Sequence, residues 1–543
     1  MKQKPYQQKR NSIKPNTVDS ARVKKNTILH LIIAFCLPVI LYLQTLTFGF
    51  NYFDDNKLIL NNIQFLSQFS NAAQAFQTDA FIKKTGHFYR PVQTISYMTD
   101  IQLSGGNNTW MYHLSNVLLL GLIACLLYLL LRRFLITARL ALLSVLLYCA
   151  NPLFVSSIAW IPARGDLLLL VFSLLSFLFF IEFLKEKKNK YLFLHWMAFT
   201  IALFCKETAV VLPVLFVIYY FAFSSEKRFD KKYLFSIVAY IVSGMFWFWL
   251  RSKAIKDFSN WNELLGVFGQ NDMVGLLPIL SNLRTIPESL AKFFLPFDIA
   301  PIPGYSLFMT LTGLGIIVLI IILFFRNKER SKKEKMFCVS WFLLLLLPTM
   351  LFKHMAIDYL DHRFFLPLIG MLIFVLFILP KKWLEKGDIK VSWIMVAALV
   401  LLSCFTFINS RSYSDPMAYY NAAISKNPNS VFAYNNRGAI YHNKGFIDKA
   451  IIDYTKAIEL LPDYASAYNN RGNAYFTQRL FDKAINDYNK AIELKWEDAN
   501  TYNNRGAAYS HKGLFDKACP DFKKAEELGS GSAKVNMAKF CNK

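Results

Sequence analysis

Two adjacent carboxylates stand just after the first long apolar segment of the sequence. In "TFGFNYFDDNKLILNN", residues 47–62, Asp54 and Asp55 follow a stretch that is rich in aromatic residues and carries no charge. A carboxylate in such a place can take a proton from a reacting hydroxyl group. The alternative is a solvated acidic turn that only begins a loop.

Further charged residues recur beside the ends of later apolar segments. They lie in the segments "YRPV", "WIPARGD", "CKET" and "DYLDHRFFLP", and they are Arg90, Arg164, Lys206, Glu207, His362 and Arg363. Charges beside a membrane are costly and usually functional or paired. We expect them to converge on one pocket in which carboxylates and cations are opposed. For Lys206 and Glu207 the alternative is that an adjacent acid and base only solvate the end of a helix.

The elements that position these residues are predicted to be membrane-spanning helices. The chain of 543 residues has a mean hydropathy of +0.30 and is 55% hydrophobic and 16% aromatic, too apolar for an ordinary soluble protein. Apolar runs long enough to cross a bilayer predict eleven spans. They lie near 28–48, 113–131, 138–156, 166–184, 191–205, 208–223, 233–250, 306–325, 336–352, 364–380 and 391–409. Residues 275–297 carry three charges and are predicted to form an interfacial or partly inserted helix.

Loop charge predicts the orientation of the chain. The formal net charge of +25 lies mainly in short loops at 132–139, 185–190, 224–232, 326–335 and 381–390, and in the N-terminal tail. This distribution is typical of cytoplasmic loops and argues against nucleic-acid binding. Residues 1–27 are then a basic cytoplasmic tail and 28–48 an uncleaved anchor. The loop 49–112, with the acidic pair, and the C-terminus face the extracytoplasmic side.

The composition changes abruptly after residue 410, where a repeat begins. Three units starting at Ala433, Ala467 and Thr501 share the pattern "YNNRG" and have the 34-residue period of tetratricopeptide repeats. Residues 415–429 match the second helix of an incomplete repeat, and the last residues form a cap. The predicted fold is therefore all-α: a transmembrane bundle over 28–410, followed by an α-solenoid over 411–543.

Paired asparagines recur on the first helix of each repeat. They are Asn435, Asn436, Asn469, Asn470, Asn503 and Asn504. Asparagine amides in such a row can hydrogen-bond the backbone of an extended peptide, and stacked repeats present a concave surface. We therefore predict that they bind a protein or peptide. The alternative is that these residues only fix helix packing and solubility.

Eight cysteines are present, six of them in or beside apolar runs. Those six have no CxxC pattern and are interpreted as small core residues. Cys519 and Cys541 lie near the C-terminus and could pair in an oxidising compartment, or remain unpaired.

The order of these motifs resembles one family. The acidic pair, "YRPV", "NPLFVSSIAWIPARGD", "KET", "HRFFLP" and the repeats follow one another as in the transmembrane-and-tetratricopeptide O-mannosyltransferases of the GT-C glycosyltransferase class. The third motif departs from the family pattern, since Asn151 replaces an expected His and Ser157 an expected Glu. These departures concern the sugar and the acceptor more than the reaction type.

The resemblance implies an inverting glycosyltransferase. It would move a mannose-like hexose from a polyprenyl phosphate to a hydroxyl of a protein or glycan at the outer face of the membrane. Asp54 would be the general base, and Asp55 would orient the acceptor or raise the pKa of Asp54 by repulsion. Arg90, Arg164, Lys206 and Arg363 would contact phosphate or sugar, with His362 behind them. No metal cofactor is expected, because arginine and lysine can stabilise a leaving phosphate.

Other function classes make different predictions. A non-enzymatic scaffold that presents repeats to an envelope complex needs only one span. A transporter or flippase predicts charged or Gly/Pro-broken residues deep within several spans. A polyprenol-linked polymerase or ligase would also act outside, but the early acidic pair favours the GT-C class. The repeat pattern and the cysteine usage fit a bacterial inner membrane, with the N-terminus cytoplasmic; an endoplasmic-reticulum membrane would give the same topology.

Overall fold

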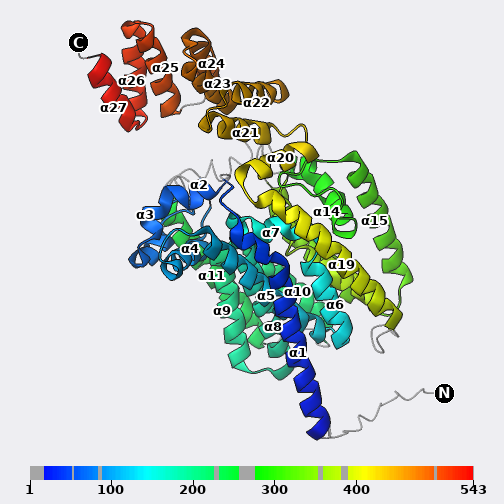
Figure 1. The fold of residues 1–543 in the computed structure, drawn as a ribbon. Coiled ribbons are helices and arrows are strands. Elements are labelled where there is room, and N and C mark those ends of the chain that lie inside the picture. The colour runs from blue at the N-terminus through cyan, green and yellow to red at the C-terminus, as the bar shows by residue number, and fades with distance from the viewer. Residues whose placement is uncertain are drawn as a thin grey trace, which may run out of the picture.

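The computed structural model describes residues 17–51, 54–82, 88–224, 231–255, 276–351, 359–380, 389–494 and 498–541. Throughout these residues the regular elements are helices, and no strand occurs among them. The all-α prediction is therefore confirmed. A helical bundle forms the larger part of the molecule, and an array of short helices extends from one end of it (Figure 1).

Each of the eleven predicted spans coincides with a helix or a pair of helices. In chain order they are α1 (Thr17–Tyr42) with η1 (Leu43–Thr47), α5 (Thr109–Arg133), α6 (Ala138–Cys149) with α7 (Val155–Ala159), α8 (Arg164–Glu186), α9 (Asn189–Cys205), α10 (Leu212–Phe223), α11 (Lys231–Ala254), α15 (Leu307–Arg326), α16 (Lys332–Met350), α17 (Leu368–Ile378) and α19 (Ile389–Ser410). The apolar runs therefore predicted where the helices lie.

The number of full spans is smaller by length and composition. In the described part of the chain six helices are long and apolar enough to cross a membrane, or seven if the pair α6 and α7, bent by 53°, counts as one. The helices α10 and α17 begin beside prolines, at Pro213 and Pro367, and are too short to be counted as full spans. The count of eleven crossings stays a prediction.

The bundle has an inner and an outer set of helices. The segments Thr109–Arg133 and Ile161–Glu186, which contain α5 and α8, have 61% and 67% of their apolar window buried inside the protein. For Leu307–Arg326 and Lys390–Tyr413 the shares are 11% and 6%, so α15 and α19 present leucine, isoleucine and valine outward. Such exposure is costly in water but suits a helix that faces lipid tails.

The predicted outer loop is an ordered layer of short helices. It contains α2 (Asp55–Leu58), η2 (Leu60–Asn62), α3 (Ile63–Leu66), η3 (Phe69–Ala72), η4 (Gln74–Gln77) and α4 (Pro91–Ser104). These elements share a small core of Leu58, Ile59, Leu66, Met98 and Ile101. The layer lies at the same end of the bundle as α7 and the repeats, whereas α1 begins at the opposite end (Figure 1).

Residues 276–294 form short helices and do not cross a membrane as one span. They are α13 (Leu276–Ser281), η10 (Asn282–Arg284) and α14 (Thr285–Phe294). Glu288 and Lys292 of α14 are buried inside the protein. The predicted helix at 275–297 is thus broken into three pieces, and two of its charges point into the protein interior.

The C-terminal part is a solenoid of paired helices. A leading helix, α20 (Pro416–Lys426), precedes three pairs, and α27 (Gly531–Phe540) caps them. The pairs are α21 (Val431–Asn443) with α22 (Ile447–Leu460), α23 (Ala465–Thr477) with α24 (Phe481–Glu493), and α25 (Ala499–His511) with α26 (Phe515–Glu527). A Cβ atom at Gly438 would lie 2.7 Å from the Tyr454 ring, which explains the glycine at that repeat position.

The repeats are joined by recurring polar contacts. Arg471 donates to both carboxylate oxygens of Asp487 in its own pair, at 2.8 and 2.9 Å, and to Thr455 of the preceding pair at 3.1 Å. Arg437 and Arg505 make equivalent contacts. Each arginine therefore fixes the angle within a repeat and between repeats.

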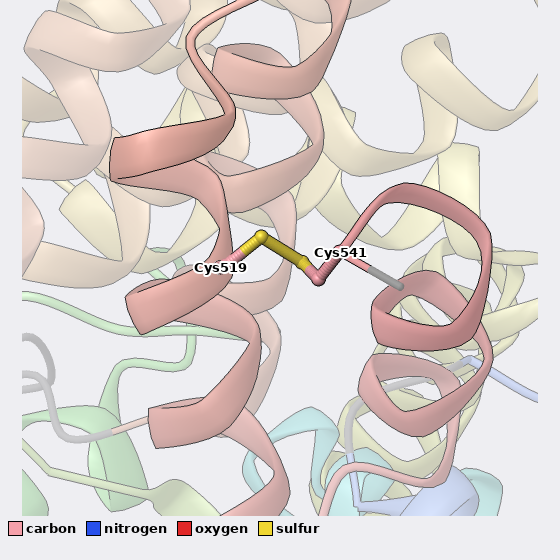
Figure 2. The surroundings of a disulfide bond; sticks show 2 residues. All are labelled: Cys519 and Cys541. Carbon is pink, nitrogen blue, oxygen red and sulfur yellow. A yellow bond between two sulfur atoms is a disulfide. The ribbon is translucent and has the colours of Figure 1, made fainter. Parts of the chain in front are cut away.

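A disulfide fastens the cap to the last repeat. Cys519 of α26 and Cys541, directly after α27, are bonded, with their Cα atoms 5.8 Å apart (Figure 2). The other six cysteines carry free thiols. The pairing that the sequence left open is therefore present in the structure.

Candidate functional site

The acidic pair stands where the chain leaves α1 and η1 and turns into the outer layer. Asp54 occupies the N-cap position of α2, and Asp55 is its first residue. Asp55 is fully buried, and its Oδ2 accepts a hydrogen bond from the Asn51 backbone N–H at 3.3 Å. Asp54 is half-buried. One carboxylate of the pair is thus locked inside the protein, and the other borders an accessible space.

Burial is the main influence on both acids. It raises the pKa of Asp55 to about 7, and the charge of Asp54 adds to this rise, while the nearby Trp160 side chain opposes it. Burial also raises the pKa of Asp54, against the opposing charges of Lys57, Arg90 and Arg363. Repulsion between the two carboxylates was predicted to raise the pKa of Asp54, but in the structure it raises the pKa of Asp55. Near neutral pH the pair holds fewer than two negative charges, and the half-buried Asp54 can accept a proton.

Lys206 and His362 meet at Asp166, a residue that the sequence analysis did not select. Asp166 lies in the first turn of α8. Its Oδ1 is 2.5 Å from Lys206 Nζ, and its Oδ2 is 3.8 Å from His362 Nε2. Asp166 lies two positions after Arg164, so the motif "ARGD" already contained this second charged residue. In the structure, Arg164 pairs with Asp100, whereas Asp166 pairs with Lys206.

Two of these groups have strongly shifted pKa values. Burial lowers the pKa of Lys206 to about 8, and Arg90 and Arg363 add to this shift while Asp166 opposes it. Burial lowers the pKa of His362 to about 3, so its imidazole is neutral at physiological pH. The His362 ring packs edge-on against Trp160, with 5.1 Å between centroids. Trp160 therefore packs on His362 and also lies near Asp55.

Arg90 and Glu207 form a second ion pair beside this cluster. Arg90 Nε lies 3.3 Å from Glu207 Oε2, and Glu207 Oε1 accepts from the Tyr89 backbone N–H at 2.8 Å. The two residues lie 117 positions apart in sequence. Lys206 and Glu207 thus make specific contacts with other segments, so they do not merely solvate a helix end.

Arg363 completes the site from η11 (Asp361–Phe364). It is half-buried and forms no ion pair within 4.0 Å with any residue that the structure describes. Burial lowers the pKa of its guanidinium, while the charges of Asp166 and Asp54 raise it. Arg363 is therefore the cation of the site with the most hydrogen-bonding capacity left for a ligand.

Arg164 does not belong to this group. Its side chain is fully buried, and its guanidinium is bound by the Asp100 carboxylate, by Asn116 Oδ1 at 2.8 Å and by the Tyr112 carbonyl at 2.6 Å. It also lies 4.8 Å from the Tyr97 ring centroid. These contacts tie α8 to α4 and α5, which makes Arg164 a structural residue. We therefore do not retain it as a phosphate contact.

A second buried network lies behind the site. Asp361, next to His362 in η11, is 3.5 Å from Lys292 Nζ of α14. Glu288 accepts hydrogen bonds from Tyr359 at 2.8 Å and from Thr310 at 2.7 Å. The sequence signals for this network were the charges in 275–297 and the segment "DYLDHRFFLP", which contains Tyr359 and Asp361. It holds η11 in place, so it positions Arg363 without facing the acidic pair.

The two positions that depart from the family motif also have structural contacts. Asn151 Nδ2 donates to the Phe293 carbonyl at 2.9 Å, and Asn151 Oδ1 accepts from the Leu153 backbone N–H at 3.0 Å. Ser157 Oγ donates to the His362 carbonyl at 3.4 Å. Both residues therefore support the segments that carry the site.

The asparagine rows of the repeats form a ladder between neighbouring units. Asn470 Nδ2 donates to Asn435 Oδ1 at 3.0 Å, and Asn536 Nδ2 donates to Asn503 Oδ1 at 2.9 Å. Their companions are bonded as well, and these are Asn436, Asn469 and Asn504. The structure therefore contains the packing contacts expected from the alternative interpretation, in which these asparagines fix the helices. Peptide binding by these six residues stays a prediction.

The described residues contain no group of three or more His, Cys, Asp or Glu side chains with the geometry of a metal site.

Comparison with known families locates two matches along the chain. Residues 94–249 match the family model described as dolichyl-phosphate-mannose-protein mannosyltransferase. Tetratricopeptide repeat models match within 419–451, 443–478, 465–495, 481–513 and 499–528. The first range includes the segment from α4 to α11 and therefore Arg164, Asp166, Lys206 and Glu207.

Several curated proteins are similar to part of the chain. The protein O-mannosyl-transferase TMTC4 of Mus musculus is 28% identical over 184 residues, which are 29% of this chain and 25% of that protein. The protein O-mannosyl-transferase Tmtc1 of Drosophila melanogaster is 31% identical, over 33% of this chain and 21% of that protein. The chain thus matches about a quarter of the length of these relatives.

Two solved structures can be named that are similar to part of the chain. The Arabidopsis OM64 TPR domain is 27% identical, with a TM-score of 0.20 over 20% of this chain and 93% of that one. MamA is also 27% identical, with a TM-score of 0.20 over 30% of this chain and 87% of that one. Together, the mannosyltransferase match, the repeat matches and the curated relatives confirm the resemblance to transmembrane-and-tetratricopeptide O-mannosyltransferases.

Proposed function

We propose that this chain is an integral-membrane glycosyltransferase that moves a mannose-like hexose from a polyprenyl phosphate to a hydroxyl group of a protein or glycan. One observation carries the proposal. The half-buried Asp54 experiences the charges of Arg90 and Arg363, at the end of the bundle where four separate segments meet. The match of 94–249 to a mannosyltransferase family supports the choice of sugar and reaction.

Asp54 would act as the general base. An acceptor hydroxyl is a weak nucleophile, and a carboxylate that takes its proton as the new bond forms lowers the barrier. The acceptor oxygen would attack the anomeric carbon from the side opposite the phosphate. The bond between that carbon and the phosphate oxygen breaks, so the configuration is inverted, and the proton remains on Asp54.

Arg363, Arg90 and Lys206 would bind the phosphate that leaves. Negative charge grows on the phosphate as the bond breaks, and fixed cations in a partly dry site stabilise it strongly. Lys206 is already paired with Asp166, and Arg90 with Glu207. Arg363 has no such pair among the described residues, so it would make the main contact. No metal is proposed for this step.

Asp166 and His362 would position the cations. Asp166 holds the Lys206 ammonium at 2.5 Å, and the neutral His362 packs on Trp160, which also lies near Asp55. The network thereby links the end that would bind phosphate to the acidic pair. A substitution of Asp166 would therefore disturb the position of Lys206 directly, and that of Asp54 only indirectly.

The proposed location is a bacterial inner membrane, with the N-terminus cytoplasmic and the repeats outside. Basic loops predict this orientation. The disulfide between Cys519 and Cys541 supports it, because such bonds form and persist in oxidising compartments. The repeats would recruit the protein that is modified, or a partner enzyme, since stacked repeats offer an extended concave surface.

The test uses membranes that contain the full chain and a labelled donor. Polyprenyl-phosphate mannose and polyprenyl-phosphate glucose are supplied separately, and membranes lacking the protein serve as the control. We expect label in protein or glycan from the mannose donor, with the anomeric configuration opposite to that of the donor. If neither donor is consumed while the repeats still bind polypeptide, the chain is a membrane-anchored scaffold and the proposal fails.

A further inference from the structure

The first helix of the repeat part is built into the membrane domain. Tyr419, Tyr420 and Ala423 of α20 belong to the same buried core as residues of α5 and α8. The Gly49 backbone N–H donates to the Ser414 carbonyl at 2.9 Å, which joins the segment before the acidic pair to the segment before α20. In Figure 1, α20 lies between the bundle and the remaining repeats.

The contacts on the other side of α20 are equally close. Tyr419 donates from its hydroxyl to the Pro301 carbonyl at 3.3 Å. A Cβ atom at Gly304 would lie 2.6 Å from Asn427, just after α20. The helix is therefore fixed to the membrane domain at both ends, and the side chains on its inner face have defined positions.

Tyr420 of α20 is buried near the acidic pair, since its hydroxyl, like that of its neighbour Tyr419, experiences the charges of Asp54 and Asp55. It is only 1% exposed, and its hydroxyl has no hydrogen bond to any described residue. Burial raises the pKa of this hydroxyl, and the charges of Asp55 and Asp54 raise it further. The phenol therefore remains protonated at physiological pH and can donate a hydrogen bond. A buried donor without a partner is costly, which is why such groups are generally satisfied or reserved for a ligand.

We propose that Tyr420 donates a hydrogen bond to the acceptor hydroxyl while Asp54 accepts the proton of that hydroxyl. This inference rests on the proposed function and extends it. The acceptor oxygen has two lone pairs, of which one attacks the sugar and the other can receive the Tyr420 hydrogen bond. The Tyr420 proton is not transferred. The repeat part would thus supply a residue to the acceptor end of the site, in addition to recruiting the acceptor.

Tyr419 offers a matched control for the test. It is the adjacent residue, it is also 1% exposed, and its hydroxyl donates to a backbone carbonyl of the membrane domain. Tyr420→Phe and Tyr419→Phe each remove one buried hydroxyl from the same helix. Because only the Tyr419 hydroxyl is hydrogen-bonded to a described residue, a merely structural role of the hydroxyls would make Tyr419→Phe the more damaging of the two variants.

The experiment measures transfer from labelled polyprenyl-phosphate mannose to a synthetic serine- and threonine-rich peptide, using the full chain in detergent. We expect Tyr420→Phe to lower kcat/KM for the peptide by about tenfold, the effect of one ordinary hydrogen bond, and to leave KM for the donor unchanged. We expect Tyr419→Phe to change both constants by less than about twofold. The melting temperatures of both variants are measured alongside.

Three results would overturn the inference. Equal kcat/KM values for Tyr420→Phe and the wild type would show that the hydroxyl has no role at the acceptor. A loss in Tyr419→Phe that equals or exceeds the loss in Tyr420→Phe would show a structural role for α20 only. If the wild type transfers nothing, the proposed function fails and the inference fails with it, whereas an active wild type with an unaffected Tyr420→Phe variant refutes the inference alone.

Discussion

Lys206 gives the sharpest test of the electrostatics of the site. The residue is only 7% exposed, and the negative charge of Asp166 and the positive charges of two arginines act on its ammonium. Burial lowers its pKa to about 8. A lysine is charged below its pKa and neutral above it, so the cation is present at neutral pH and is lost as the pH rises through about 8. At about pH 9 only about one tenth of the molecules keep this charge. We therefore expect kcat/KM for the donor to fall about tenfold between pH 7 and 9.

The acidic pair determines how kcat/KM falls at low pH. Burial raises the pKa of Asp55 to about 7 and also raises that of Asp54. A carboxyl group is protonated below its pKa and cannot then act as a base, so activity is lost as the pH falls through the raised pKa of Asp54. The profile is then bell-shaped, with its acidic limb at the raised pKa of Asp54 and its alkaline limb near pH 8.

The assay follows initial rates of label transfer at donor concentrations far below KM, because kcat/KM reports the ionisation of the free enzyme. Wild type and Lys206→Arg are compared across this range. Arginine keeps its charge throughout, so the variant should lose the fall on the alkaline side. Lys456→Arg, an exposed lysine of the repeats, is the control. An unchanged alkaline fall in Lys206→Arg would refute the assignment of that limb to Lys206.

Four further changes test other parts of the account. Arg363→Ala should raise KM for the donor by about tenfold or more, the effect of losing a charge-assisted hydrogen bond, and an unchanged donor KM would contradict its role at the phosphate. Arg164→Ala should lower the free energy of unfolding by about 3–5 kcal/mol, since it leaves the buried Asp100 carboxylate unpaired, and thermal unfolding in detergent measures this. Arg471→Ala should lower the stability of the repeats by about 1–3 kcal/mol, because the contacts with Asp487 are lost. Limited proteolysis should then cleave the C-terminal part faster, and an unaltered cleavage rate would contradict the stabilising role of these contacts. Treatment with EDTA should leave transfer intact, because guanidinium and ammonium groups stabilise the phosphate, and a loss restored by a divalent cation would contradict this.

The helices could be predicted from the sequence because each apolar run is local information. The repeats were equally accessible, since a 34-residue period fixes both the helix pairs and the close contacts at Gly438. The number of membrane crossings was less accessible. Two apolar helices, α10 and α17, are shorter than a full span, and the 53° bend between α6 and α7 changes how one span is counted.

The site was predicted in part. Asp54, Arg90, Lys206 and Arg363 could be selected because they are charges beside apolar runs, and the structure brings them together. Arg164 satisfied the same criterion but points into the protein, since a charge at the end of a span can face a buried partner as readily as a ligand.

Other contacts depend on tertiary structure alone. The Lys206 partner Asp166 lies 40 positions away, and no local pattern pairs them. Tyr420 was one of several tyrosines of the repeats, and only the packing of α20 against the membrane domain distinguishes it. The asparagine rows show the converse case, because a regular pattern that suggested a binding surface is used for contacts between repeats.

The measurement that tests the central claim most directly is label transfer from polyprenyl-phosphate mannose by Asp54→Asn. The control is Asp463→Asn, which alters an exposed carboxylate of the repeats. The account predicts that Asp54→Asn folds, still binds the donor and loses transfer by about 100-fold or more, the contribution of a general base, while the control keeps wild-type activity. Full activity in a folded Asp54→Asn variant would contradict the claim that this carboxylate is the base.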